Sequence, residues 1–326
     1  MTVVPRRFVI LGAGAVGGLV AASLRRAGDT VTVIARGTQL AALRESGLRL
    51  DGPDGTDVVQ LDVADSPAGV GWQDDDAVIL AVKSQDTQAA LEVLEAYAPP
   101  SVLVICAQNG VDNERAALRR FPATLGMCVN CPATFLETGV IRVSSARPTG
   151  ALDVGRYPGG SDEVVADIAT RLRAAGFDSQ ARADVMRWKY AKLLVNLGNS
   201  VEALCGPAAR GGDLSALLRQ EGEACLHAAG LGFVPADEFR SRMSSLVMTR
   251  TGARDGGSSW QSMARGTGSI EADYLNGEIV LLGRLHGVPT PANALVQRRA
   301  VQAARARRRP GSVSEQELLD DLAAVA

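Results

Sequence analysis

The feature that most constrains the fold of this chain is a glycine motif between a strand pattern and a helix pattern near the N-terminus. The apolar run RFVIL (residues 7–11) is typical of a buried strand, and it leads into a G-x-G-x-x-G sequence, Gly12-Ala13-Gly14-Ala15-Val16-Gly17. A helical pattern then continues to about residue 27, and TVTVIA (residues 30–35) is a second strand pattern. A strand, a glycine turn, a helix and a second strand form the context in which this spacing indicates dinucleotide binding.

Each glycine of this motif has a physical reason. Gly12 permits the tight turn, Gly14 lets the backbone approach a pyrophosphate, and Gly17 allows the helix to pack against the strand. Exposed N–H groups and the dipole at the helix N-terminus then hold the phosphates. We therefore expect all six residues of the motif to form the phosphate part of a cofactor site.

Arg36 indicates which dinucleotide the chain binds. An NAD-binding chain usually has Asp or Glu about 20 residues after the motif, at the end of the second strand, to hold the ribose 2′-hydroxyl. Here the strand ends in VIARG, so Arg36 stands at that end, whereas Asp29 precedes the strand and lies at the wrong end. The planar, permanently charged guanidinium of Arg36 suits a 2′-phosphate. We predict NADP(H) as the cofactor.

The first half of the chain has the pattern of a parallel α/β sheet. Strand patterns at 77–82 and 101–107 flank a helix at 84–97, and strands that alternate with helices of this length indicate βαβ units. From 125 to 154 the pattern is β-rich, which predicts an antiparallel extension of the sheet, and a helix at 161–175 follows. We expect a Rossmann-type, dinucleotide-binding α/β domain over residues 1–182.

The second half has helical patterns, and the length of 326 residues also favours two domains. Helices are expected at 184–206, 213–231, 236–249, 258–286 and 291–308. Ser314 and Glu317 have the spacing of a capping box, which predicts a short final helix. We therefore expect a mostly α-helical domain over residues 183–326.

The composition excludes several classes of function. Lys and Arg (34) nearly balance Asp and Glu (36), so the chain has no general attraction for nucleic acid or anionic lipid. Apolar runs are too short to cross a membrane, and a signal peptide would remove the glycine motif, so we expect a cytoplasmic protein. Cys128 and Cys131 have C-x-x-C spacing without a second pair of zinc ligands, so we expect buried structural thiols and no metal site.

Four ordered blocks of the sequence resemble the ketopantoate reductase (2-dehydropantoate 2-reductase) family. They are the glycine motif with the arginine after the second strand, the stretch ILAVKSQDT, the stretch CAQNGVDNE, and the pair formed by WKYAKLLVN with SSWQ and IEADYLNG. The residues that carry the resemblance are Arg36, Lys83, Asn109, Lys192, Asn196, Ser259 and Glu271. The resemblance implies a Rossmann-type domain followed by a helical domain, with Lys83 and Asn109 on the cofactor side and Asn109 also near the substrate.

The chemistry of ketone reduction explains several of these residue types. Negative charge develops on the carbonyl oxygen as hydride arrives, so a nearby group must donate a proton. Lys192 is our candidate, as the resemblance also implies, and Asn196 shares its helical face and could bond the substrate carboxylate or hydroxyl. Glu271 would orient Lys192 and balance its charge, and Ser259 would add a hydrogen bond to the substrate. Lys189, three residues before Lys192, is a rival for the same role.

Two positions depart from the family pattern. Ser200 stands where members of the family typically have an asparagine, and Asn199 just before it could supply the missing amide. Arg210 stands where they have a further asparagine, and it could clamp a carboxylate bidentately. We therefore predict Asn199, Ser200 and Arg210 as substrate-binding residues and leave the identity of the substrate open.

We expect the chain to catalyse NADPH-dependent reduction of a small 2-keto acid, with ketopantoate, which would give pantoate for pantothenate biosynthesis, as the first candidate. Two alternatives stay open: a relative that reduces a different 2-keto acid or ketone, and a non-catalytic NADP(H)-binding redox sensor on the same fold. The presence of Lys192, Asn196 and Glu271 together favours an enzyme. The oligomeric state stays open, with a homodimer as one option.

Overall fold

The chain forms two compact units in the computed structural model, which describes residues 4–244, 246 and 256–324. One unit consists of Met1–Lys189 and Ala236–Thr251, and the other of Tyr190–Pro235 and Gly252–Ala326. The sequence predicts a single boundary between residues 182 and 183. The first unit instead continues to Lys189, and it also includes helix α9 (Ala236–Met243) from the helical half of the sequence. In the described part of the chain, no helix is long and apolar enough to cross a membrane.

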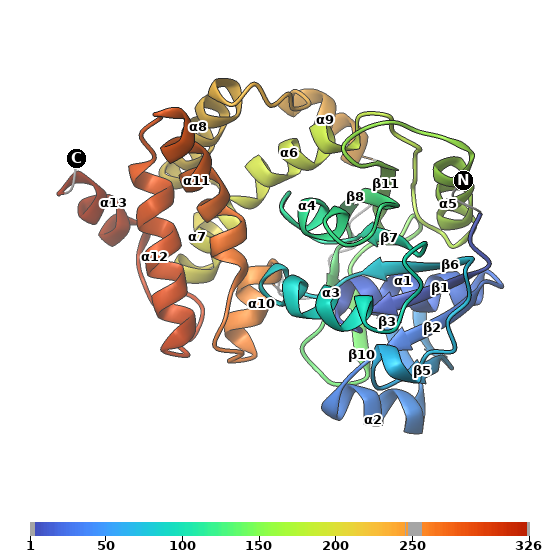
Figure 1. Ribbon diagram of the computed structural model, residues 1–326. Coiled ribbons are helices and arrows are strands. Elements are labelled where there is room, and N and C mark those ends of the chain that lie inside the picture. Colours follow the sequence, from blue (N-terminus) through green and yellow to red (C-terminus); the bar gives the residue numbers. More distant parts are fainter. Residues whose placement is uncertain (1–3, 245, 247–255, 325–326) are drawn as a thin grey trace. The chain divides into compact units, whose positions relative to one another are not determined.

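The first unit is built on a seven-stranded sheet in the order β11-β8-β7-β6-β1-β2-β5 (Figure 1). Every neighbouring pair is parallel except β8 and β11, which are antiparallel. This observed strand pairing confirms the predicted parallel α/β sheet and, through β11, its predicted antiparallel extension. The strands are β1 (Arg7–Leu11), β2 (Thr30–Ile34), β5 (Asp62–Ala64), β6 (Asp76–Leu80), β7 (Leu103–Cys106), β8 (Thr124–Asn130) and β11 (Ala151–Arg156).

Side chains of β1 alternate between two cores, one on each face of this sheet. Phe8 and Ile10 belong to one core, whereas Val9 and Leu11 belong to the other. Helices α1 and α5 contribute to the first core, and α3 and α4 to the second. Because both faces are covered, ligands have access to the sheet at the carboxyl ends of its parallel strands. These helices are α1 (Ala15–Arg26), α5 (Glu163–Ala174), α3 (Thr87–Glu95) and α4 (Asn113–Leu118).

A separate four-stranded sheet has the order β4-β3-β10-β9. The expectation that all of 125–154 extends the main sheet is therefore wrong for β9 and β10, because β10 pairs in parallel with β3 and β9 pairs with β10. The wholly buried Ile141 of β10 packs so closely on Gly18 of α1 that a side chain at Gly18 would overlap it, and this contact holds β10 against α1. The strands are β3 (Leu48–Gly52), β4 (Gly55–Val59), β9 (Ala133–Thr134) and β10 (Val140–Val143).

The helical patterns beyond residue 183 are confirmed as helices, but two predicted helices are interrupted. The pattern at 184–206 forms α6 (Val185–Asn196) and α7 (Gly198–Cys205). The pattern at 258–286 forms α10 (Ser258–Ala264), the 3-10 turn η4 (Glu271–Tyr274) and α11 (Asn276–His286). Two glycines in the left-handed region, Gly266 (φ 63°) and Gly268 (φ 77°), lie in the break between α10 and η4.

The other helices agree with the sequence patterns. The predicted helix at 236–249 is α9 as far as Met243, and residues 245 and 247–249 lie outside the described residues. The capping box is confirmed, because Ser314 accepts a hydrogen bond of 3.1 Å from the backbone N–H of Glu317. The remaining elements are the 3-10 helices η1 (Pro67–Gly69), η2 (Ser84–Asp86) and η3 (Pro207–Gly211), and the helices α2 (Gly37–Ser46), α8 (Asp213–Ala228), α12 (Pro291–Arg305) and α13 (Glu315–Ala323).

A chain of polar side chains, three of them buried and the fourth half-buried, joins the helices of the second unit. Ser200 of α7 donates to Asn276 Oδ1 at 2.8 Å, and Asn276 Nδ2 donates to Asn293 Oδ1 at 3.0 Å. Asn293 Nδ2 in turn donates to Glu221 Oε2 at 2.8 Å. Glu221 also accepts from two backbone N–H groups at the start of α12. The network connects α7, α8, α11 and α12, and it uses the hydroxyl of Ser200 inside the unit.

Helix α9 is held in the first unit by a buried arginine. Arg242 donates to both carboxylate oxygens of Asp153 on β11, at 2.6 and 3.0 Å, and to Asp178 Oδ2 at 2.6 Å. The buried Phe239 of α9 also packs against Trp188, with 6.3 Å between the ring centroids. These contacts explain why a helix from the second half of the sequence belongs to the first unit.

The polar network of the second unit should contribute much of its free energy of unfolding. We expect Asn293→Ala to lower the free energy of unfolding by about 2–4 kcal/mol, because it leaves several buried donors and acceptors without partners. The matched control Gln302→Ala removes an exposed side chain from the same helix and should change that free energy by less than about 0.5 kcal/mol. Urea unfolding followed by circular dichroism measures both, and equal stability of the two variants would contradict this reading.

Candidate active site

The glycine turn after β1 has the three properties that a phosphate cradle requires. Gly12 has a φ of 113°, and a Cβ there would lie 2.8 Å from the backbone of Ala81 and Val82. A Cβ at Gly17 would overlap the carbonyl oxygen of Gly12, so α1 packs directly on the turn. At Gly14, in contrast, a Cβ would meet nothing within 4 Å. The backbone at Gly14 is thus open to a ligand, and the turn fits a dinucleotide pyrophosphate.

Gln39 is a residue of this site that the sequence reasoning missed. Its Nε2 donates to the carbonyl oxygen of Ala13 at 3.1 Å, and its Oε1 accepts from the N–H of Gly139 at 2.8 Å. The side chain therefore holds the glycine turn from the side of α2. No spacing rule marks a glutamine three residues after the predicted arginine, so the sequence offered no signal for it.

Arg36 lies at the end of the second strand, as the sequence predicts. It is exposed, directly precedes α2, and its guanidinium makes no hydrogen bond or ion pair with the described residues. Asp29, at the opposite end of β2, is bound by Arg171 of α5, whose Nε donates to Asp29 Oδ1 at 2.7 Å. Asp29 is therefore engaged at the opposite end of β2, and Arg36 is an exposed cation just after that strand.

A buried hydrogen-bond network joins the ends of β6 and β7. Asn113 donates to the carbonyl oxygen of Asn109 at 3.0 Å and accepts from Thr87 at 2.8 Å. Gln108 donates to the carbonyl oxygen of Val82 at 2.9 Å and to Thr87 at 2.7 Å. These bonds fix the backbone on both sides of the predicted residues Lys83 and Asn109.

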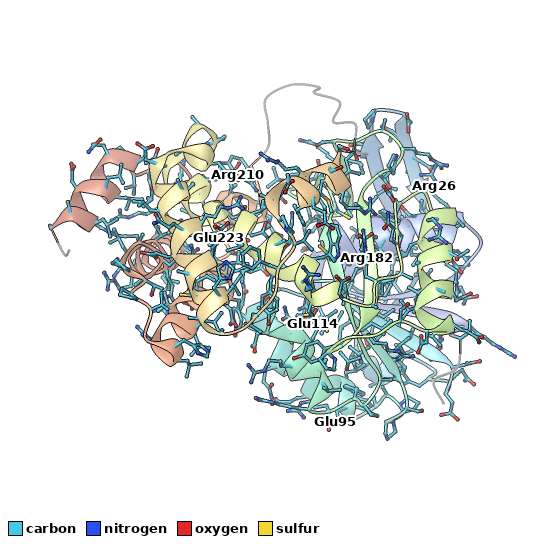
Figure 2. All side chains as sticks on the ribbon, turned by 90° about the horizontal axis from the view of Figure 1, so that it is seen from above. Arg26, Glu95, Glu114, Arg182, Arg210 and Glu223 are labelled. Atoms are coloured by element: carbon cyan, nitrogen blue, oxygen red, sulfur yellow. The ribbon has the colours of Figure 1, made fainter. Side chains whose placement is uncertain are left out.

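A buried ion pair lies beneath the same strand end. Lys189 Nζ lies 2.5 Å from Glu114 Oε1 and donates to the carbonyl oxygen of Gln108 at 3.0 Å (Figure 2 labels Glu114). The exposed fractions of the two side chains are 2% and 0%. Burial raises the pKa of the Glu114 carboxyl, and the Lys189 ammonium opposes that shift. Burial also raises the pKa of the nearby Cys106 thiol well above its usual range.

The other predicted residues belong to the second unit. Lys192 and Asn196 are four residues apart on α6 and share one face, with Lys192 half-buried and Asn196 buried. Asn199 on α7, Ser259 on α10 and Glu271 at the start of η4 are also buried. The predicted residues thus form two groups, one in each unit.

Glu202 is a partner of Arg210 that the sequence did not predict. Its carboxylate is wholly buried and accepts a hydrogen bond of 2.9 Å from Arg210 Nη1. Arg210 is therefore not a free positive charge. A lone glutamate on a helical pattern is usually a surface residue, so only the fold could reveal this pairing.

The C-x-x-C cysteines lie in and after β8, where Cys128 is buried and Cys131 is half-buried, and neither forms a disulfide with a described residue. Among the described residues, no group of three or more His, Cys, Asp or Glu side chains is placed to hold a metal ion.

The sequence and the fold match one family along most of the chain. The family model "Ketopantoate reductase PanE/ApbA" matches residues 8–159, and the model of its C-terminal part matches residues 184–303. A 2-dehydropantoate 2-reductase of Halobacterium salinarum is 30% identical over 300 residues, covering 87% of this chain and 94% of that protein. One from Pyrococcus horikoshii is 29% identical over 299 residues, covering 89% and 95%. The crystal structure of a PanE/ApbA family ketopantoate reductase from Ralstonia eutropha JMP134 has a TM-score of 0.78 at 27% identity, covering 92% and 99%.

The ion pair between Lys189 and Glu114 can be tested by a double-mutant cycle. We expect Lys189→Met to lower the free energy of unfolding by about 3–5 kcal/mol, because Glu114 is left as an unpaired buried charge. The double variant Lys189→Met/Glu114→Met should recover more than half of that loss, since two apolar side chains replace both charges. Urea unfolding gives the four free energies. Additive effects of the two substitutions would show that the pair does not act as a unit.

Proposed function

The chain belongs to the ketopantoate reductase family, and we propose that it uses NADPH to reduce ketopantoate to pantoate. The observation that carries the proposal is the match to both family models along the chain, together with Lys192 and Asn196 on one face of α6. The open glycine turn supports a dinucleotide cofactor, and Arg36 supports the phosphorylated form.

The first unit would hold the cofactor. The N–H groups of residues 12–17 and the start of α1 would bind the pyrophosphate, and the Arg36 guanidinium would pair with the 2′-phosphate. Lys83 and Asn109, at the ends of β6 and β7, would contact the nicotinamide half. When bound, the cofactor supplies the hydride.

The second unit would bind the keto acid and supply the proton. Lys192 would donate a proton from its ammonium to the carbonyl oxygen, and Glu271 would orient that ammonium and balance its charge. Asn196 would bind the substrate carboxylate or hydroxyl, and Ser259 and Asn199 would add hydrogen bonds. The engagement of Lys189 with Glu114 and with a backbone carbonyl favours Lys192 over Lys189 as the donor.

The test follows NADPH absorbance with ketopantoate and a panel of other 2-keto acids. Consumption with ketopantoate supports the proposal, and consumption only with another carbonyl compound supports a relative with a different substrate. Tight NADPH binding without turnover of any substrate would instead indicate a redox sensor.

Lys192→Ala should lower kcat by at least about 100-fold, because a positioned general acid typically contributes that much or more. Its dissociation constant for NADPH, measured by cofactor fluorescence, should stay within about twofold of the wild-type value, since Lys192 is assigned to the proton and not to the cofactor. Arg187→Ala, which removes an exposed side chain from the same helix, is the matched control and should leave kcat unchanged. Near-normal turnover by Lys192→Ala would remove Lys192 from this role.

Arg36→Ala should raise the dissociation constant for NADPH by about 10- to 100-fold, because a hydrogen bond to a charged group contributes about 1.5–3 kcal/mol. The constant for NADH, which lacks the 2′-phosphate, should hardly change. Arg44→Ala, an exposed arginine on the following helix, serves as the control for net charge. Equal losses for both cofactors would contradict a contact between Arg36 and the 2′-phosphate.

A further inference from the structure

Gln39 connects the glycine turn to the second sheet of the first unit. It lies in the first turn of α2, three residues after Arg36, and its side chain is half-buried. Its Nε2 donates to the carbonyl oxygen of Ala13 at 3.1 Å, and its Oε1 accepts from the N–H of Gly139, just before β10, at 2.8 Å (Figure 1 labels α2 and β10). Two segments that lie far apart in the sequence therefore meet at one amide group.

The orientation of this amide is fixed by the chemistry of its two partners. A backbone N–H group can only donate a hydrogen bond, and a backbone carbonyl can only accept one. In the flipped orientation, the NH₂ group would face the Gly139 N–H and the amide oxygen would face the Ala13 carbonyl, so both hydrogen bonds would be lost. Gln39 therefore presents its NH₂ group to the Ala13 carbonyl.

The Gly139 end of this contact is held by its own neighbours. The carbonyl oxygen of Gly139 accepts from the N–H of Arg49 on β3 at 2.9 Å. Gly139 has a φ of 76°, and a Cβ there would lie 3.1 Å from the Cβ of Ala42, so α2 packs closely on this residue. Two residues further on, Ile141 packs on Gly18 of α1. The second sheet thus supports the glycine turn and its helix at two points.

The bond to Ala13 determines where the next N–H group points. In a trans peptide, the carbonyl oxygen and the following N–H lie on opposite sides of the C–N bond. Because the Ala13 carbonyl faces Gln39, the Gly14 N–H points away from α2. Gly14 is the N-cap of α1, whose first N–H groups have no acceptor within the helix. The Gly14 N–H is therefore directed to the side where a phosphate oxygen can accept from it.

We propose that Gln39 is a positioning residue for the cofactor pyrophosphate. By holding the Ala13 carbonyl, it sets the Gly14 N–H in the direction in which that group donates to a phosphate oxygen, and it acts through the backbone without touching the cofactor. This inference rests on the proposed function only in placing a dinucleotide pyrophosphate at the glycine turn. It also gives the second sheet a role in cofactor binding, because Gly139 fixes the other end of the Gln39 amide.

Gln39→Met tests the inference, because it keeps the length of the side chain and removes both hydrogen bonds. We expect the dissociation constants of NADPH, NADH and ADP-ribose to rise about 10- to 100-fold, since all three carry a pyrophosphate that loses a well-directed donor. The constant for adenosine 2′-monophosphate, which has no pyrophosphate, should stay within about twofold of the wild-type value. Cofactor fluorescence measures the first two constants, and calorimetry measures the others.

Gln39→Glu is a second, isosteric variant that separates the two bonds. Its carboxylate still accepts from the Gly139 N–H, but the oxygen that replaces Nε2 cannot donate to Ala13. It should therefore weaken the same three ligands at least about tenfold, which keeps the inference testable even if Gln39→Met does not fold. Gln88→Met is the matched control, because it removes an exposed glutamine, bonded to Glu92 at 2.7 Å, from the first turn of α3. Its dissociation constants should equal those of the wild type.

The outcomes distinguish this inference from the proposed function. ADP-ribose binding requires neither turnover nor a 2′-phosphate, so the inference can hold even if ketopantoate is not reduced and the proposed function fails. Equal weakening of ADP-ribose and adenosine 2′-monophosphate in Gln39→Met would indicate a general disturbance of α2 and would overturn it. Unchanged ADP-ribose binding in both Gln39 variants, within about twofold, would also overturn it and leave Gln39 as a packing residue.

Discussion

The close approach of α1 to the glycine turn is the constraint on which the cofactor edge of this protein depends. A side chain at Gly17 would overlap the carbonyl oxygen of Gly12, so the helix can reach this position only with glycine there. The same helix meets the second sheet through Gly18 and Ile141, and Gln39 ties the turn to the backbone just before β10. Because the packing leaves Gly14 open, the start of α1 remains available to a phosphate.

The second unit contains two groups of hydrogen-bonded polar side chains within its apolar interior. One network, from Ser200 through Asn276 and Asn293 to Glu221, is complete, since each member has a partner. A second group, in which Glu202 accepts from Arg210 and from the Gly257 N–H, is incomplete, because Glu202 Oε1 and the nearby Asn199 Oδ1 accept no hydrogen bond from a described residue. Adjacent residues of α7 thus have different surroundings. The Ser200 hydroxyl donates to Asn276 in the helix packing, whereas Asn199 Oδ1 lies near Gly257.

The sequence predicted the parts of the fold that follow from local rules. The strand, glycine turn and helix at the N-terminus and the capping box at Ser314 were predictable because spacing alone specifies them. The break of the predicted helix at 258–286 was missed because the helical pattern runs across Gly266 and Gly268, whose left-handed conformations interrupt the helix in the fold. The partners Glu202, Glu114 and Gln39 were missed for another reason: each is set by a contact between distant elements, which no periodicity records.

The anchoring of α9 by Arg242 has a consequence for how the chain can be divided. The chain passes between the two units three times, after Lys189, after Pro235 and after Thr251, so neither unit is one continuous piece of sequence. A fragment that ends at Lys189 would leave the buried carboxylate of Asp153 without Arg242 and the ring of Trp188 without Phe239. The segment of the first unit that contains α9 is joined on both sides to chain of the second unit. This interleaved connectivity couples the two units in folding, whatever their individual stabilities.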